Sequence, residues 1–209
     1  MSTLAVLPVK VFGEAKQRLT PALPPERRRA LAEAMVLDVL AALGRVPGLP
    51  VAVVTAEPTA REAALAAGAE LLDDTEQAGQ SAAAAVGVRH ALERGFDRVL
   101  LVPGDTPLLD PDELQTLLAS SAAVTIVPDR HGTGTNALLL APPDAIAPSF
   151  GPGSFERHRE AAGPAARVEP LSTLTLDVDT GDDLGALMRA LASARGAAAT
   201  RAALSRVTA

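Results

Sequence analysis

The sequence contains no cysteine, tryptophan or tyrosine, and phenylalanine occurs only four times. The lack of cysteine excludes disulfides, thiolate nucleophiles and cysteine-based zinc or iron–sulfur sites, and it predicts a cytoplasmic protein. Because aromatic residues make up only 2% of the chain, its core must be built from leucine, valine and alanine.

Basic charge is also scarce, and the formal net charge is −6. This balance argues against a nucleic-acid-binding protein, whose binding surface is basic. The N-terminal segment has no basic region, and its short apolar run is interrupted by Pro8, so we expect no signal peptide. No apolar run approaches the length of a membrane span. The few lysines and arginines therefore matter by position.

Apolar patterns of strand and helix type alternate along the chain. Strands are expected at residues 4–9, 49–55, 69–74, 97–105, 123–129, 137–142, 167–171 and 174–180, the last closing the sheet. Helices are expected at 25–43, 58–68, 79–95, 110–121, 150–163 and 182–196. This alternation predicts an α/β domain with helices on both faces of a largely parallel sheet. We expect one domain over 1–196 and an alanine-rich tail over 197–209, either helical or frayed.

Polar motifs follow the predicted strands, where the ligands of open α/β sheets bind. After the first strand, Lys10, Lys16 and Arg18 flank Gly13, which lets the backbone approach a ligand. Such a loop can hold an anionic triphosphate, although it matches neither of the common glycine-rich phosphate motifs. The alternative is three solvated cations at a turn.

Three carboxylates also follow strands. Asp105 comes after the most apolar strand, and strand alternation puts Asp177 and Asp179 on one face of the last one. Two carboxylates so placed repel each other unless a cation lies between them, and a purely oxygen-based site favours Mg²⁺. The alternatives are a turn cap for Asp105 and a solvated strand face for the pair. Residues 182–183 are better explained as acids of a helix start.

Two further stretches suggest a polar ligand. The loop "RHGTGTN" contains Thr135, which offers a hydroxyl and a backbone N–H, although the loop could also be purely structural. In "FGPGSFERH", Gly151 precedes Ser154 at a helix start, so Ser154 is a candidate helix cap and the free N–H groups are a candidate anion site. The histidines at 90, 131 and 158 have no ligand-like spacing, and no nucleophile elbow is present.

Together, "PVKVFGEAKQRL", "LLVPGDTPLL", "PDRHGTGTNALLL", "FGPGSFERH" and "LDVDTGDDL" closely resemble the guanylyltransferases of coenzyme F-420 biosynthesis, which act on phosphoenolpyruvate or 2-phospho-L-lactate. The resemblance covers roughly residues 3–190. It implies a nucleotidyltransferase-like, Rossmann-like fold with a mixed, mainly parallel sheet. It also implies GMP transfer from GTP to phosphoenolpyruvate, giving enolpyruvoyl-2-diphospho-5'-guanosine and pyrophosphate.

The resemblance implies roles for individual residues. The metal ligands are Asp105, Asp177 and Asp179, which hold Mg²⁺, as two ions. The resemblance assigns the phospho-acid contacts to Thr135, Gly151 and Ser154. It assigns nucleotide contacts to Lys10, Gln80 and Ser81, and the hold on the triphosphate to Lys16 and Arg18, which with Asp105 are also the implied catalytic residues.

Alternatives remain open at this point. The acceptor could be 2-phospho-L-lactate or 3-phosphoglycerate. The strand-end carboxylates also fit a molybdenum-cofactor or sugar-1-phosphate nucleotidyltransferase, or a D-x-D glycosyltransferase. Outside enzymes, the chain could be a catalytically silent nucleotide-binding module. We expect small-molecule substrates, hand-over of product to a downstream transferase, no nucleic-acid or membrane partner, and a possible homodimer.

Overall fold

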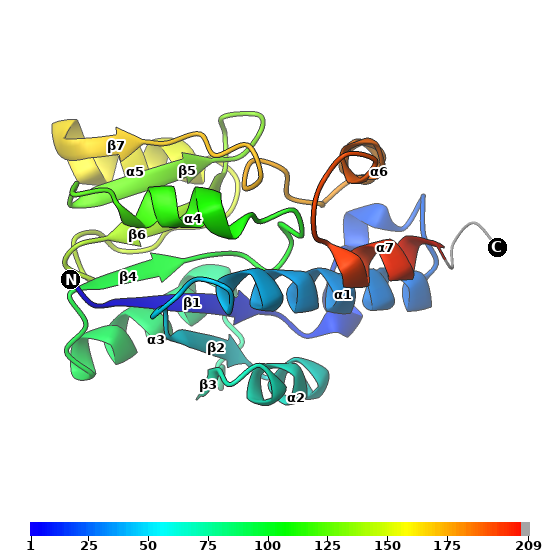
Figure 1. Ribbon diagram of the computed structural model, residues 1–209, viewed down its shortest axis with the longest axis horizontal. Coiled ribbons are helices and arrows are strands. Elements are labelled where there is room, and N and C mark those ends of the chain that lie inside the picture. Colours follow the sequence, from blue (N-terminus) through cyan, green and yellow to red (C-terminus); the bar gives the residue numbers. More distant parts are fainter. Residues whose placement is uncertain (206–209) are drawn as a thin grey trace.

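The computed structural model describes residues 1–205 and shows a mixed sheet in the strand order β3-β2-β1-β4-β6-β5-β7 (Figure 1). All strand pairs are parallel except those that β6 makes with β4 and β5. The predicted fold class is confirmed. The strands are β1 Thr3–Val9, β2 Val51–Thr55, β3 Glu70–Asp73, β4 Arg98–Leu101, β5 Val124–Pro128, β6 Thr135–Leu140 and β7 Ala166–Val168.

Helices cover both faces of the sheet, as the alternating pattern predicts (Figure 1). On one face α1 (Pro25–Leu43), α2 (Pro58–Ala66) and α4 (Pro111–Leu118) pack over apolar side chains from β1, β2, β4, β5 and β6. On the other face lie α3 (Gln80–Glu93) and α5 (Ser154–Ala162). Every residue of β1 is buried, because the strand is covered from both sides.

The winding of the sheet reverses between β1 and β4. From β1 the chain adds β2 and β3 on one side, and later adds β4 on the other side of β1. Loops that leave two such neighbouring strands diverge and open a crevice beyond the strand ends. The loop after β1, with its short 3₁₀ turns at Phe12–Glu14 and Gln17–Leu19, and the loop after β4 meet at this crevice.

The antiparallel direction of β6 brings a strand start to the same edge. Its first residue, Thr135, lies where the parallel strands end, because β6 runs against β4 and β5. The pairing with β5 shifts register at Val127/Pro128, which pairs Pro128 with Thr135 and leaves Asn136 unpaired in the ladder. The loop before β6 and the strand ends therefore face one crevice.

Residues 174–180 form no strand, so the prediction that they close the sheet is wrong. Leu174, Leu176 and Val178 are buried between less buried neighbours, so the alternation in the sequence is real. The alternation arises because Leu174 joins the core under α1, α2 and α4, whereas Leu176 and Val178 join a separate apolar cluster that includes α6. Val178 donates its N–H to the carbonyl oxygen of Asp105, 3.2 Å away, without joining a ladder. The edge strands are β3 and β7.

A third apolar cluster joins the last two helices, α6 (Gly181–Leu191) and α7 (Ala198–Ser205), to α1. In the middle of α1, the buried Asp38 accepts hydrogen bonds from the backbone N–H groups of Ala199 (3.0 Å) and Thr200 (2.7 Å) at the start of α7. The carboxylate thus caps α7 and complements its dipole. Within the expected tail, residues 198–205 are helical, and residues 206–209 lie outside the described residues.

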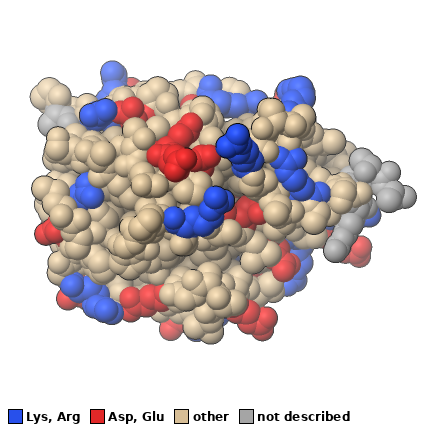
Figure 2. All heavy atoms as spheres, in the orientation of Figure 1, with Lys and Arg blue, Asp and Glu red and all other residues tan. Residues whose placement is uncertain are grey.

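Charged side chains of both signs are interspersed on the face in Figure 2, without a broad basic patch on the described part of that face. Among residues 1–205, no helix has the length and apolar character needed to cross a membrane.

Candidate active site

Three carboxylates meet at the crevice. Asp105 follows β4, whereas Asp177 and Asp179 come from the irregular segment before α6, and one oxygen from each lies within 4.8 Å of the others. Pairs of carboxylates at this distance repel each other unless a cation offsets their charge. An all-oxygen donor set of this kind suits a hard divalent cation.

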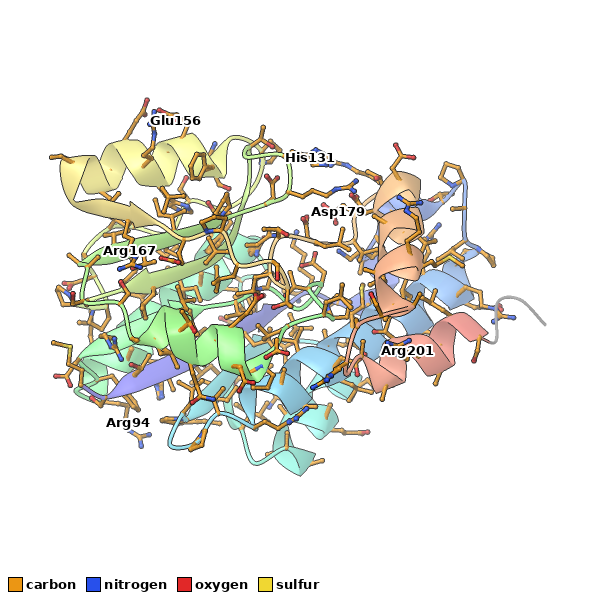
Figure 3. The ribbon with its side chains drawn as sticks, turned by 45° about the horizontal axis from the view of Figure 1, so that its top comes forward. Arg94, His131, Glu156, Arg167, Asp179 and Arg201 are labelled. Atoms are coloured by element: carbon orange, nitrogen blue, oxygen red, sulfur yellow. The ribbon has the colours of Figure 1, made fainter. Side chains whose placement is uncertain are left out.

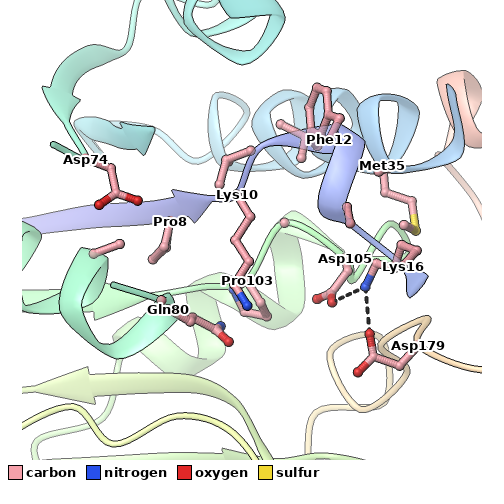
Figure 4. Close-up of a pocket in the computed structure, with 17 residues that line it drawn as sticks. Pro8, Lys10, Phe12, Lys16, Met35, Asp74, Gln80, Pro103, Asp105 and Asp179 are labelled. Atoms are coloured by element: carbon pink, nitrogen blue, oxygen red, sulfur yellow. Dashed lines mark hydrogen bonds and ion pairs between the residues drawn. The ribbon is translucent and has the colours of Figure 1, made fainter. Parts of the chain in front are cut away.

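The side chain of Lys16 lies in this cluster. Its Nζ donates to Asp105 Oδ2 at 2.5 Å and to Asp179 Oδ1 at 2.9 Å, and the side chain is only 9% exposed (Figure 4). Burial lowers the pKa of Lys16, but the two carboxylates outweigh burial and hold its pKa above the ordinary value. Lys16 is therefore a permanent cation. Its backbone adopts the left-handed conformation (φ 56°), which few non-glycine residues do.

Of the three carboxylates, Asp177 is the one that forms no ion pair with Lys16. Burial, followed by the negative charge of Asp105, raises its pKa to about 6. Asn136 partly opposes this shift, because its Nδ2 donates to Asp177 Oδ1 at 3.2 Å. The same Nδ2 donates to the carbonyl oxygen of Leu174 at 2.8 Å. Asn136 thus ties the start of β6 to the segment that carries the two later carboxylates.

Two adjoining cavities flank the carboxylates. The first lies between the end of β1 and the start of α3, and Figure 4 shows Asp74 and Gln80 away from the carboxylates, beyond Lys10. The second extends toward β6 and α5 and includes Thr135. Residues that line both cavities are Lys10, Gln80, Pro103, Asp105 and Asp179. The carboxylate cluster therefore stands at the junction of two spaces that separate ligands can occupy.

The second cavity contains the predicted acid-binding residues. Thr135, Gly151 and Ser154 all line it, together with Arg18 and His131. His131 and Asp179 lie in the same part of the molecule in Figure 3, far from Arg94. Gly151 has φ of +105°, a conformation that favours glycine.

Ser154 is not the helix cap that the sequence suggests. Gly153, in the left-handed conformation, occupies the N-cap position, and Ser154 is the first residue of α5. The Ser154 hydroxyl is buried and has no hydrogen-bond partner among the described residues. An unpartnered buried hydroxyl at a helix N-terminus is well suited to bind an anion that enters the cavity.

The glycine–threonine loop before β6 is shaped by one carboxylate. Asp129 accepts hydrogen bonds from the backbone N–H of His131 (3.1 Å) and of Thr133 (2.9 Å). A Cβ atom at Gly134 would lie 2.7 Å from Asp129 Oδ2, so a larger residue here would displace the carboxylate that holds the loop. The loop is therefore structurally defined, and it still lines the second cavity.

Of the remaining residues predicted to contact the nucleotide, some line a cavity and one does not. Lys10 and Gln80 line both cavities, and Arg18 lines the second. Ser81 lines neither, and its hydroxyl accepts a hydrogen bond from the backbone N–H of Phe150 at 2.8 Å. Asp183 belongs to the capping box of α6 with Thr180, in agreement with its expected role as a helix-start acid.

Sequence reasoning missed Asn136 and His158. Asn136 was part of the loop motif but carried no predicted role. The spacing of the histidines suits no metal site and gives His158 no role, yet His158 lies in the "FGPGSFERH" stretch, four residues after Ser154. Residues four apart lie on the same face of a helix, so the sequence could have indicated that His158 lies on the same side of α5 as Ser154.

Solved structures share this fold. A candidate nucleotide-diphospho-sugar transferase from Desulfovibrio desulfuricans G20 matches with a TM-score of 0.79 at 20% identity, covering 98% of this chain and 94% of that one. A nucleotidyl transferase from Methanothermobacter thermautotrophicus matches with a TM-score of 0.63 at 15% identity, covering 88% and 95%.

Sequence relatives are more specific. A phosphoenolpyruvate guanylyltransferase from Conexibacter woesei is 51% identical over 95% of this chain and 93% of its own length. A 2-phospho-L-lactate guanylyltransferase from Methanothermobacter thermautotrophicus is 36% identical over 90% of this chain and 85% of its own. The family model described as "Guanylyl transferase CofC like" matches residues 3–195. The chain belongs to this guanylyltransferase family.

Proposed function

We propose that this protein transfers GMP from GTP to phosphoenolpyruvate, giving enolpyruvoyl-2-diphospho-5'-guanosine and pyrophosphate. The observation that carries the proposal is the position of the carboxylate cluster at the junction of two cavities, each bordered by cationic or anion-binding groups. Membership of the guanylyltransferase family and the relative at 51% identity support the reaction and the acceptor.

We assign the nucleotide to the first cavity, which extends from the carboxylates to Gln80 at the start of α3, and the phospho-acid to the second. Lys10 and Gln80 border both, so the triphosphate spans the junction. The phospho-acid enters the space lined by Thr135, Gly151 and Ser154, where hydroxyl groups and a helix N-terminus can donate hydrogen bonds to an anion. This arrangement brings the acceptor phosphate toward the α-phosphate of GTP.

The chemical step needs no protein nucleophile. A phosphate oxygen of the acceptor, already an anion at neutral pH, bonds to the α-phosphorus of GTP. The bond from that phosphorus to the oxygen bridging the α- and β-phosphates breaks, and pyrophosphate leaves with the electron pair. No proton is transferred. The protein aligns two anions and offsets their charge, which is where phosphoryl-type transfer derives most of its acceleration.

Asp105, Asp177 and Asp179 fit a divalent cation by donor type and spacing. Bound Mg²⁺, as one or two ions, would neutralise phosphate charge and orient the reacting oxygens. Lys16 now ion-pairs with two of these carboxylates, so its ammonium group lies where it can turn to the triphosphate when a metal ion takes the carboxylates. Arg18, which lines the second cavity and not the first, adds positive charge on the acceptor side.

The domain over 1–196 carries these groups, and α7 supports it through α1. The product is a mixed anhydride, which suits direct hand-over to a downstream transferase of the coenzyme F-420 pathway. The alternative acceptor is 2-phospho-L-lactate, which the relative at 36% identity is named for, with 3-phosphoglycerate as a third.

The test follows pyrophosphate release with Mg²⁺, each of the four nucleoside triphosphates and each of the three phospho-acids. We expect release with GTP and phosphoenolpyruvate only when both substrates and Mg²⁺ are present. Release with 2-phospho-L-lactate at a higher kcat/KM would reassign the acceptor. GTP binding without release under any combination would identify a silent nucleotide-binding module.

A further inference from the structure

His158 is the most buried polar side chain near the second cavity. It lies on α5, is 0% exposed, and both ring nitrogens are paired. Its Nδ1 lies 2.9 Å from the hydroxyl oxygen of Thr135, and its Nε2 lies 2.8 Å from the backbone nitrogen of Ser149. One imidazole ring therefore joins the start of β6 to the loop that precedes α5.

These contacts determine where the ring carries its proton. The backbone N–H of Ser149 can only donate, so Nε2 of His158 must be the unprotonated, accepting nitrogen. In the neutral ring the proton then lies on Nδ1, which donates to Thr135 Oγ1. Burial, followed by the charge of Arg157, lowers the pKa of His158 to about 4, so the ring is neutral at physiological pH.

The tautomer fixes the role of the Thr135 hydroxyl. Its oxygen accepts the proton of His158 Nδ1, so its own hydrogen must be donated elsewhere. Thr135 is buried among its neighbours but lines the second cavity, where the phospho-acid is proposed to bind. A hydroxyl held as a donor toward an anion avoids the reorientation that a freely rotating hydroxyl requires.

We propose that His158 is a positioning residue that holds the Thr135 hydroxyl as a hydrogen-bond donor to the anionic acceptor. The inference rests on the proposed function, since it deepens the acceptor site. His158 does not touch substrate in this role and acts through Thr135.

The His158 ring also holds the loop that precedes α5. Besides the bond to Ser149, its edge-on contact with Phe150 puts the ring centres 5.3 Å apart. Arg157 holds the loop from its other side, because its guanidinium donates to Ser149 Oγ (2.7 Å) and to the carbonyl oxygen of Pro152 (2.6 Å). His158 thus has two separable contacts, one toward Thr135 and one toward the loop, and an experiment must separate them.

Three substitutions make that separation. His158→Phe keeps a buried ring and removes both hydrogen bonds. His158→Asn keeps a donor near the Nδ1 position, within reach of Thr135, but cannot reach Ser149. His158→Gln keeps an acceptor near the Nε2 position, which suits Ser149, but loses the bond to Thr135. Each variant is first checked for folding by circular dichroism and thermal midpoint.

We expect His158→Phe to raise the KM for phosphoenolpyruvate about tenfold or more, the scale of a lost hydrogen bond to a charged group, while the KM for GTP changes less than about twofold. His158→Asn recovers most of the acceptor KM, and His158→Gln does not. The reverse order, with Gln recovering and Asn not, would overturn the proposal in favour of a loop-bracing role. Equal rises in both KM values would also overturn it.

A double substitution provides a second readout that does not depend on side-chain mimicry. Thr135→Val removes the hydroxyl with little change in shape. If His158 acts through Thr135, adding His158→Phe to Thr135→Val raises the acceptor KM by less than about twofold further, because the two changes remove one interaction. Multiplied effects of the two changes would contradict the proposal.

His90→Phe is the matched control. His90 lies on α3, makes an ion-pair contact with Glu70 at 3.1 Å and lines neither cavity. It should leave both KM values unchanged. If the wild-type protein releases no pyrophosphate with any phospho-acid, the proposed function has failed. The His158 variants are then compared for thermal stabilisation by phosphoenolpyruvate alone, and equal stabilisation of all of them overturns the positioning role.

Discussion

The carboxylate cluster and the acceptor site are built on opposite principles. At the junction of the two cavities, Asp105 and Asp179 hold Lys16 through short ion pairs, and all three side chains come from loops. On the acceptor side, Thr135 and His158 are neutral, buried and carried by a strand and a helix.

The two sites should therefore respond to different changes. Like charges held on loops repel one another unless cations offset them, so the carboxylate cluster should respond to metal ions and pH. A neutral hydrogen-bond network on regular elements is already formed, so it should respond to the loss of single atoms. Each prediction below tests one side of this contrast.

The largest effect is expected from Asp105→Asn. The amide keeps the shape but removes one carboxylate and a partner of Lys16, so pyrophosphate release should fall at least about 100-fold, the scale on which one electrostatic contact affects kcat. Asp182→Asn, the same change at an exposed acid in the first turn of α6, is the control and should retain activity. A folded Asp105→Asn protein with near-normal turnover would remove the metal assignment.

Lys16→Met tests whether the charged side depends on its own cation. Without the ammonium group, Asp105 and Asp179 face each other uncompensated, so the thermal midpoint should fall. Mg²⁺ should then raise the midpoint by more than it does in the wild-type protein, at about 2–4 °C for each kcal/mol gained. Lys10→Met is the control, because Lys10 also lines the first cavity but makes no ion pair with these carboxylates. Identical Mg²⁺ responses in both variants would show that Lys16 does not compete with the metal.

Asp177 gives the pH dependence. Burial and Asp105 raise its pKa from 3.8 to about 6, so between these values the folded protein binds more protons than the unfolded chain. Without divalent metal, its contribution to the free energy of unfolding should therefore fall as pH rises from about 4 to about 6, by about 1–3 kcal/mol. Chemical denaturation of wild type and Asp177→Asn across that range measures this. Parallel stability curves for the two proteins would rule out the shift.

The smallest effect is expected on the neutral side, from Ser154→Ala. Because the buried hydroxyl has no partner among the described residues, its removal should leave the thermal midpoint equal or slightly higher. The KM for the phospho-acid should nevertheless rise about two- to tenfold, with the KM for GTP unchanged. Ser121→Ala, at an exposed site after α4, is the control. A rise confined to the KM for GTP would mean that the acceptor cavity is misassigned.

Elements bounded by strong local signals could be predicted from sequence. The helix expected at 25–43 is found at Pro25–Leu43, because proline favours its first turn and a glycine follows its end. The candidate ligands Asp105, Asp177 and Asp179 could be named because they follow apolar runs, and the structure brings their oxygens together.

Features that depend on distant pairing could not be predicted. The alternation in 174–180 reports which side chains are buried, and it cannot report whether the backbone joins a sheet. Lys16 meets Asp105 and Asp179 across 89 and 163 positions of sequence, so its ion pairs follow only from the strand order. The buried role of His158 likewise depends on Thr135, which lies on another element.

The adjacent residues Thr135 and Asn136, at the start of β6, contact different parts of the site. Thr135 bonds to His158 on the acceptor side, and Asn136 bonds to Asp177 in the carboxylate cluster. Two neighbouring residues at the start of one strand thus connect His158 with the carboxylate cluster. If binding of the acceptor changes the affinity for Mg²⁺, linkage requires that Mg²⁺ change the affinity for the acceptor by the same factor.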